Sequence, residues 1–294
     1  MKDNISVALA TYNGAKYIEE QLVSLINQSL LPCEIIIIDD FSTDNTFEIL
    51  KEIQKNYPLI LLYRNDENIG PIETFKKAIK YCNSEYIALC DQDDIWELNK
   101  IELSFNEIKK MNQSLPSIVF TDLKMIDAHG SLIGDSFWKT QGYNPKKTKF
   151  SDLLISNVVT GCTIMMNGKM KKEIEKMPNK VIMHDYWIAL IAFSLGCYKI
   201  IDSNTIKFRV HVASVTDKSK ISIFARIKLA IGAFTGSQID YKCQNILQAE
   251  YFFNIYKERL SKENSREILR FLSLKNKSTV MKKIYVGYLK YFSF

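Results

Sequence analysis

The sequence predicts an α/β fold in which a mostly parallel sheet is flanked by helices. Four short apolar runs, at 5–10, 34–38, 59–63 and 86–90, alternate with segments of helical periodicity. The run at 34–38 is continuous and β-branched, which is typical of a strand covered on both faces. Polar residues follow each run, and doubly wound sheets bind their ligands beyond the carboxyl ends of their strands.

The segments between these runs have the marks of helices. Apolar side chains between Ile18 and Ile26 share one helical face. Ser42 and Asp44 are typical of a helix start and predict a second helix to about residue 57. A third helix is expected from the turn at Gly70 to about residue 83.

The second half of the chain is less regular. We expect a helix near 100–110 and a strand at 117–121, followed by a polar region at 130–149. Three further apolar segments lie at 157–166, 183–195 and 198–210, and a long helix rich in Tyr and Phe is expected around 244–260. From about residue 221 the pattern is helical and basic, with 13 Lys and Arg against 5 Asp and Glu from Ser222 onward. This surplus indicates an anionic surface partner.

Composition excludes several classes of protein. Of the 294 residues 47% are hydrophobic, with only 11 Gly and 6 Pro, so an intrinsically disordered chain is not expected. No two of the six cysteines form a Cys-x-x-Cys pair. Their scattered positions suggest reduced thiols in a cytoplasmic protein. The N-terminus has no signal-peptide core, and no apolar run reaches the roughly 20 residues needed to span a bilayer. We therefore expect a cytoplasmic protein that is at most peripheral on the inner membrane face.

An acidic cluster, Asp91-Gln92-Asp93-Asp94, directly follows the strand expected at 86–90. Three carboxylates within four residues repel one another unless a cation holds them. Oxygen ligands on a strand end suit Mg²⁺ or Mn²⁺, and such ions bridge diphosphates. The alternative is a solvated acidic turn.

Two smaller groups of polar residues allow a functional and a structural interpretation. Asp40, after the Ile-rich strand, either supports the start of the next helix or accepts the N3–H of a pyrimidine base. The base interpretation gains from Thr11 and Tyr12 on the neighbouring strand, since Tyr12 could stack on a base. Asp185 opens an apolar helix, where an acid is usually a cap. His211 could equally be an ordinary surface histidine.

Together these residues resemble the family 2 glycosyltransferases, which have the nucleotide-diphospho-sugar transferase (GT-A) fold. The matching segments occur in the family's order over about residues 1–215 and are most like bacterial rhamnosyltransferases of surface polysaccharide synthesis. Related galactosyl- and glucosyltransferases share much of the pattern. The matching segments are Val7–Gly14, Ile36–Asp44, Asn68–Gly70, Asp91–Trp96, Thr160–Thr163, His184–Trp187 and Arg209–His211.

The resemblance implies a role for each matching residue. Asp185 corresponds to the general base, and Asp93 and His211 to metal ligands for Mn²⁺ or Mg²⁺. Arg209 and His211 would contact the diphosphate or the metal when a loop closes. The nucleotide-binding residues would be Thr11, Tyr12, Asn13, Asp40, Asp44, Arg64 and Asp91. The residues along the sugar and acceptor pocket would be Asp94, Trp96, Gly161, Cys162, Thr163, His184, Trp187 and Arg209.

The resemblance also implies an inverting transfer of a sugar, rhamnose being favoured, from a dTDP- or UDP-linked donor. The acceptor would be a glycan or a polyprenyl-diphosphate-linked glycan. Residues 1–220 would form the catalytic domain, with a nucleotide-binding half to about 115 and an acceptor half after it. Residues 221–294 would form a helical region that contacts a membrane surface, mediates a homodimer or packs on the catalytic domain. A non-enzymatic protein that binds an anionic surface is the alternative from another class. No motif for nucleic-acid binding is present.

Overall fold

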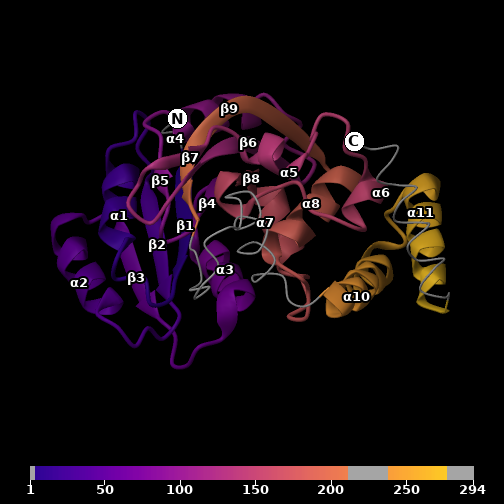
Figure 1. Cartoon of the computed structure of the whole chain (residues 1–294), viewed down its shortest axis with the longest axis horizontal. Helices are drawn as coiled ribbons and strands as arrows, with labels where there is room; N and C mark the ends of the chain where they lie inside the picture. Colours follow the sequence, from indigo (N-terminus) through magenta and orange to yellow (C-terminus); the bar gives the residue numbers. More distant parts are fainter. Residues whose placement is uncertain (1–3, 211–237, 277–294) are drawn as a thin grey trace, which may run out of the picture.

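The computed structural model describes residues 4–210 and 238–276 (Figure 1). Their nine strands form one curled sheet in the order β3-β2-β1-β4-β8-β6-β9-β5, with β7 paired to β6. Six strands run in one direction, while β5, β7 and β8 run antiparallel to their neighbours. The expected α/β fold with a mostly parallel sheet between helices is therefore confirmed.

The first half of the chain is a regular alternation of strands and helices. Strands β3, β2, β1 and β4 are all parallel, and α1 and α2 lie at the outer end of the sheet (Figure 1). Each strand falls within two residues of the position expected from the sequence. The elements are β1 (Ile5–Thr11), α1 (Ile18–Ile26), β2 (Glu34–Asp39), α2 (Thr46–Asn56), β3 (Ile60–Arg64), α3 (Gly70–Tyr81) and β4 (Tyr86–Cys90).

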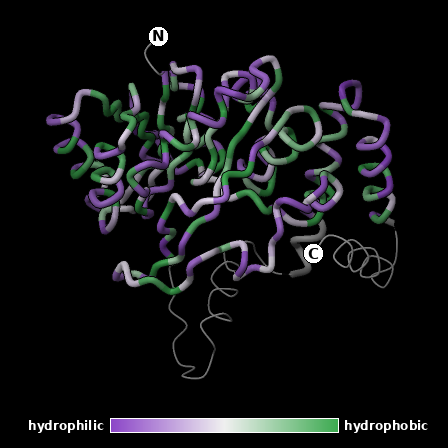
Figure 2. Tube along the Cα trace, turned by 90° about the horizontal axis from the view of Figure 1, so that it is seen from above, coloured by the Kyte–Doolittle hydropathy of each residue, from purple (hydrophilic) through white to green (hydrophobic). Residues whose placement is uncertain are grey.

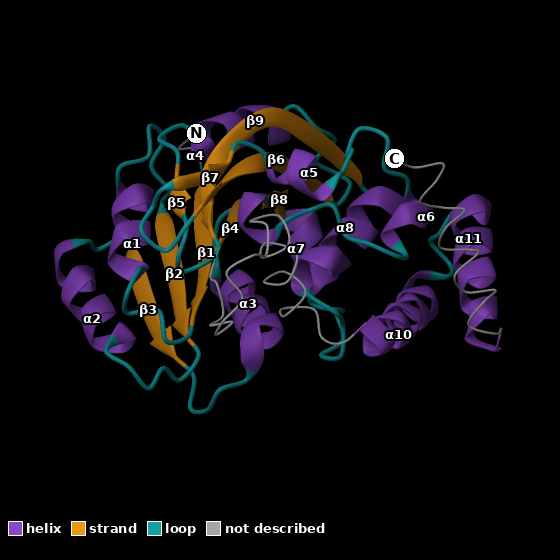
Figure 3. Ribbon diagram, viewed as in Figure 1, coloured by secondary structure: helices purple, strands orange, loops and turns teal. Residues whose placement is uncertain are grey.

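The second half is mixed, and its central strand β6 continues five residues beyond the expected 117–121. Helices α10 and α11 lie at the opposite end of the molecule from α2 (Figure 3). The elements are β5 (Ile95–Trp96), α4 (Lys100–Ile108), β6 (Ser117–Ile126), β7 (Leu132–Gly134), α5 (Phe137–Gln141), α6 (Phe150–Leu153), η1 (Gly161–Thr163), β8 (Met165–Asn167), α7 (Gly168–Ile174), α8 (His184–Ser194), β9 (Cys197–Arg209), α10 (Gln238–Tyr256), α11 (Lys262–Ser273) and η2 (Leu274–Asn276).

Strand β2 separates two hydrophobic cores. Ile36 and Ile38 belong to the core that contains α3 and α8, whereas Ile35 and Ile37 belong to the core beneath α1 and α4. All four side chains are fully buried. Hydrophobic segments accordingly gather along the strands in the middle of the molecule (Figure 2). An unbroken apolar run is needed here because both faces of the sheet are covered.

The described part of the C-terminal region is helical and packs against α8. Trp187 of α8 is fully buried, with its ring 5.2 Å from that of Phe252 and 6.2 Å from that of Tyr256. Within 4–210 and 238–276, no helix combines the length and apolarity that crossing a membrane requires. His211 and six of the 13 Lys and Arg after Ser222 lie outside the described residues.

Candidate active site

Three neighbouring strands end at the same edge of the sheet. β1 pairs in parallel with β2, where Thr11 lies opposite Asp39, and with β4, where Leu9 lies opposite Cys90. The loops that follow these strands must therefore meet. The acidic turn after β4, here defined as Asp91–Asp94, lies beside the loop that follows Thr11.

Gln92 fastens the acidic turn to the end of β1. Its Oε1 accepts hydrogen bonds from Thr11 Oγ1 (2.7 Å) and from the backbone N–H of Tyr12 (2.8 Å), and its Nε2 donates to the Tyr12 carbonyl (3.1 Å). Gly14 leaves room for this amide, since a Cβ there would lie 2.5 Å from Gln92 Oε1. The role of Gln92 was not expected from the sequence, although its place inside the acidic turn was a signal.

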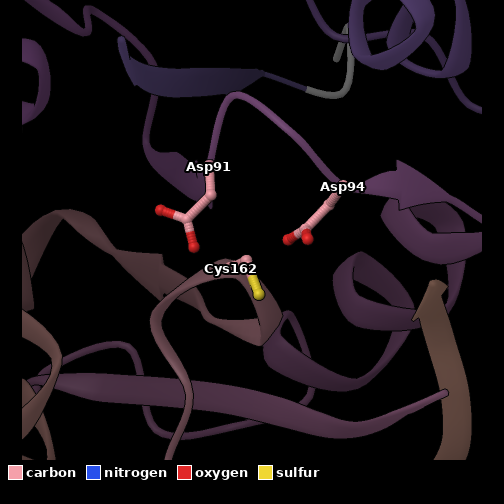
Figure 4. A group of neighbouring side chains, drawn as sticks. All are labelled: Asp91, Asp94 and Cys162. Carbon is pink, nitrogen blue, oxygen red and sulfur yellow. The ribbon is translucent and has the colours of Figure 1, made fainter. Parts of the chain in front are cut away.

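Two carboxylates of the acidic turn point toward the thiol of Cys162 (Figure 4). One ligand atom from each of Asp91, Asp94 and Cys162 lies within 4.8 Å of the others. Asp94 is 1% exposed, and its Oδ2 finds no N–H or O–H donor in the described part of the chain. A buried carboxylate oxygen without a donor is suited to a cation, so these residues fit a divalent ion. Asp93, the expected metal ligand, lies on the same turn but not in this group.

Burial raises the pKa of Asp91 to about 7, and the charges of Asp93 and Asp185 add to the effect. Burial and the charges of Asp93 and Asp91 likewise raise the pKa of Asp94. Carboxylates with raised pKa values bind protons readily when no cation is near. A divalent ion would lower both values, because it stabilises the ionised forms.

A buried lysine lies beneath the acidic turn. Lys100 is fully buried at the start of α4, and its Nζ lies 3.9 Å from the centre of the Trp96 ring. Burial lowers the pKa of Lys100 to about 8, while Cys162, Cys90 and Asp94 act in the opposite direction. Lys100 is a second residue whose place in the site the sequence analysis missed. Its ammonium supplies positive charge to the buried side of the turn.

Arg209 holds the acidic turn from behind. Its Nε donates to the Asp93 carbonyl (2.9 Å), its Nη1 to the Asp127 carbonyl (3.2 Å) and its Nη2 to a Glu20 carboxylate oxygen (2.6 Å). Its backbone N–H also donates to Asp94 Oδ1 (3.1 Å). Arg209 is 3% exposed. In this structure the guanidinium is buried and donates to protein groups, and the contact with a diphosphate that is expected when a loop closes stays a prediction.

Asp185 lies in the first turn of α8, opposite the acidic turn. Its Oδ2 accepts a hydrogen bond from the Gly161 N–H (3.1 Å). Burial raises the pKa of Asp185 to about 7, against the hydrogen bonds that it accepts from backbone N–H groups. Its charge also raises the pKa of Asp91, which places the two carboxylates in one electrostatic environment. The structure thus gathers Asp185, Gly161, Cys162 and the acidic turn.

The expected nucleotide-binding residues hold the loops beside this group. Asp40 is 3% exposed and accepts hydrogen bonds from Asn65 Nδ2 (2.8 Å), Ile69 N (2.9 Å) and Gly70 N (2.8 Å). These contacts occupy the Asp40 oxygens at the start of α3 and not at the start of α2, the next helix in the chain. Tyr12, by contrast, is 44% exposed and free to stack on a flat ring.

Asn13, Asp44 and Arg64 fasten the same loops to one another. Asn13 has a φ of 50° and accepts from the Thr43 N–H (2.8 Å). The carboxylate of Asp44 accepts from Ala15 N (3.2 Å) and from the hydroxyl of Thr46, and the latter bond helps to lower the pKa of Asp44 against burial. Arg64 Nε lies 3.3 Å from Asp39 Oδ2.

Two aromatic residues expected along the sugar and acceptor pocket are buried in the core of this structure. Trp96 is 3% exposed beneath Lys100, and Trp187 is fully buried against α10. Thr163 is also fully buried, and its hydroxyl donates to the Thr160 carbonyl (2.7 Å). A sugar cannot reach these side chains in the observed conformation. Apolar and small polar residues in such motifs can also build the core, and the place of Trp96, Thr163 and Trp187 along the pocket stays a prediction.

His184 is a neutral, stacked side chain rather than a charged one. Its ring lies 4.0 Å from that of Phe75 at an interplanar angle of 25°. Burial lowers the pKa of His184 to about 3. A Cβ on Gly161 would lie 3.1 Å from His184 Nε2 and 3.5 Å from Asp185 Cβ, so a larger residue would require His184 or this segment to shift.

Comparison with known proteins identifies the family. Residues 6–173 match Glycosyl transferase family 2. This match covers more than half of the chain, and the chain therefore belongs to that family and is a glycosyltransferase. The resemblance stated from the motifs is confirmed.

Two relatives are named for a glycosyl transfer activity. The chain is 30% identical over 200 residues to the putative teichuronic acid biosynthesis glycosyltransferase TuaG of Bacillus subtilis, covering 67% of this chain and 75% of that protein. It is 28% identical over 264 residues to the dTDP-rhamnosyl transferase RfbG of Shigella flexneri, covering 84% and 86%.

Solved structures share the fold. A crystal structure of S. aureus TarS 1-349 in complex with UDP has a TM-score of 0.54 and 19% identity, covering 86% of this chain and 72% of that chain. A structure of the same TarS segment in complex with UDP-GlcNAc has a TM-score of 0.55 and 18% identity, covering 92% and 79%. At this identity the likeness concerns the fold alone.

Proposed function

We propose that this chain is an inverting, metal-dependent glycosyltransferase of cell-surface polysaccharide biosynthesis. It would transfer a sugar from a dTDP- or UDP-linked donor to a hydroxyl of a glycan or a lipid-linked glycan. The observation that carries the proposal is the gathering of the acidic turn, Cys162 and Asp185 at the ends of β1 and β4. Rhamnose is the favoured sugar, because a dTDP-rhamnosyl transferase aligns over 84% of this chain. Galactose and glucose are the alternatives.

Asp185 serves as the general base. A hydroxyl is a weak nucleophile, and a carboxylate within hydrogen-bonding distance can take its proton as the bond to the anomeric carbon forms. A raised pKa makes Asp185 a stronger base than an ordinary aspartate, and a divalent ion on the acidic turn would favour its ionised form. The Gly161 N–H, which donates to Oδ2, orients the carboxylate.

The acidic turn would hold Mn²⁺ or Mg²⁺. Asp93 is proposed as the ligand that faces the donor, with Asp91 and Asp94 beside it, and His211 as a ligand beyond the described residues. When bound, the ion neutralises the charge that gathers on the leaving diphosphate. Gln92 and Arg209 fix the turn from two sides, so that its carboxylates need little reorganisation to bind.

Nucleotide recognition is proposed for the loop after β1 and its neighbours. Tyr12 would stack on the base, with Thr11, Asn13, Asp44 and Arg64 shaping the cavity and Asp40 holding it. Residues 1–220 would form the catalytic domain, split near residue 115 into nucleotide-binding and acceptor halves. The cations after Ser222 would attract an anionic membrane surface, where a polyprenyl-diphosphate-linked acceptor resides, and a homodimer through this region is the alternative.

The test is metal-dependent binding of nucleoside diphosphates. UDP or dTDP with Mn²⁺ should raise the melting temperature, and the increase should vanish with EDTA. Asp93→Asn should abolish the increase, whereas Asp202→Asn, an exposed acid paired with Lys146, should keep it. Asp185→Asn should keep the increase and lose turnover of the donor.

Other results would contradict parts of the proposed function or select a different donor. A protein that binds only an anionic surface predicts no metal-dependent stabilisation by either nucleotide. Normal turnover by Asp185→Asn would remove the base assignment. Release of UDP or dTDP from a panel of dTDP-rhamnose, UDP-galactose and UDP-glucose would separate the favoured donor from the alternatives.

A further inference from the structure

Helix α10 contacts the polypeptide on both sides of Asp185. Before α8, the backbone N–H of Ile182 donates a hydrogen bond to Gln248 Oε1 (2.9 Å). After Asp185, the hydroxyl of Tyr186 accepts a hydrogen bond from Asn245 Nδ2 (3.0 Å). Gln248 is 2% exposed and Asn245 is 4% exposed, so neither bond competes with bulk water.

Asn245 also connects α8 to the segment that leads toward Gly161. Its Nδ2 donates to the carbonyls of Leu154 and Ile155, both at 3.0 Å. The same amide therefore touches α8 and the region that follows α6. Gly161, farther along this region, donates to the carboxylate of Asp185. Asn245 thus contacts Tyr186, the residue after Asp185, and a segment that ends six residues before Gly161.

The start of α8 lacks a capping side chain of its own. Its N-cap residue, Met183, makes no side-chain hydrogen bond to the helix. The first N–H groups of a helix need other partners, and the Asp185 carboxylate accepts from those of Asp185 and Tyr186. Gln248 holds the backbone that enters the helix, at Ile182, one residue before the N-cap. The aromatic packing of Trp187 on Phe252 holds the next turn of α8 from the same side.

We propose that Gln248 and Asn245 are positioning residues that hold Asp185 in place for proton transfer. This inference rests on the proposed function, in which Asp185 is the general base. It gives the region after Ser222 a part in catalysis that is separate from any contact with a membrane. Because a misplacement of the base by a fraction of an ångström is costly, loss of the Gln248 bond should lower kcat about tenfold.

The variants remove or keep the side-chain atoms of Gln248 and Asn245 that make these hydrogen bonds. Gln248→Ala removes the acceptor for Ile182, and Gln248→Glu retains an acceptor oxygen at the same position. Gln244→Ala removes the same side chain from an exposed position one turn away and is the matched control. Asn245→Asp has nearly the same shape but loses the amide donor that three acceptors share.

Two measurements apply to these variants. The first is release of nucleoside diphosphate from dTDP-rhamnose, UDP-galactose and UDP-glucose without an acceptor, where water is the nucleophile. Gln248→Ala should lower kcat about tenfold at an unchanged KM for the donor, and Gln248→Glu should restore it. The second is hydrogen exchange, in which the Ile182 amide and the first turn of α8 should exchange faster in Gln248→Ala and in Asn245→Asp.

The outcomes separate this inference from the proposed function. Equal exchange and equal kcat in Gln248→Ala and Gln244→Ala would overturn the positioning role, even where Asp185→Asn is inactive. A rise in KM with unchanged kcat would also overturn it, because that pattern indicates altered donor binding. Normal turnover by Asp185→Asn would instead remove the proposed base. Should none of the three donors react, the exchange measurement still decides whether α10 holds the start of α8.

Discussion

Asp185→Asn should increase the stability of the fold while it removes activity. The wild-type carboxyl has a pKa of about 7 in the folded chain, against 3.8 as its ordinary value, because burial disfavours its charge. Asparagine is neutral at every pH and retains an oxygen that can accept from the Gly161 N–H. The substitution therefore removes the cost of burying a charge and leaves most of the packing intact.

The expected gain depends on pH with a defined sign. Between pH 3.8 and 7 the unfolded state loses its proton while the folded state keeps it, so wild-type stability falls as pH rises. One pKa unit corresponds to about 1.4 kcal/mol, and the full difference corresponds to at most about 4 kcal/mol above pH 7. About 3 kcal/mol of this gain should appear between pH 5 and pH 8.

Urea unfolding of wild type and Asp185→Asn at pH 5 and pH 8, without metal or nucleotide, measures this gain. Asp202→Asn replaces an exposed carboxylate and is the control. Its stability relative to wild type should not increase with pH. A difference between wild type and Asp185→Asn that is equal at both pH values would show that Asp185 is not desolvated. Added Mn²⁺ should reduce the gain, since a cation near Asp91 favours the ionised form of Asp185.

Three further substitutions test other parts of the site. Gly161→Ala places a methyl group 3.1 Å from His184 Nε2 and should lower kcat about tenfold with nucleotide-dependent thermal stabilisation unchanged. Asp40→Asn weakens the bonds to Asn65 and to the 69–70 backbone and should cost about 2 kcal/mol in urea unfolding; a neutral result would contradict its structural role. Wild-type stability should rise by about 3 kcal/mol between pH 8 and pH 10.5, because the unfolded state there binds the Lys100 proton more tightly than the folded state. Lys100→Met should lack that rise, and curves of equal slope would show that Lys100 is not buried as a cation.

The sequence alone was enough to predict the parallel half of the sheet. Local signals decide such elements: the unbroken run at β2 requires cover on both faces, and the polar ends of β1, β2 and β4 mark one edge of the sheet. The family also followed from the sequence, because its motifs are short, ordered strings. The extra length of β6 was not predictable, since its last residues pair with β9, about 80 residues later.

The roles of individual side chains depended on contacts between distant segments. An arginine or a tryptophan can belong to a binding site or to a core, and the residue type does not say which. Arg209 and Trp187 are buried in this structure because of their contacts with Asp93 and Phe252. Gln248 gave no signal at all, because its partner is a backbone N–H 66 residues earlier in the chain. Periodicity and motif order determine elements and family. Which side chains remain available for chemistry depends on burial and on hydrogen bonds between distant segments. These contacts exist only in the tertiary structure.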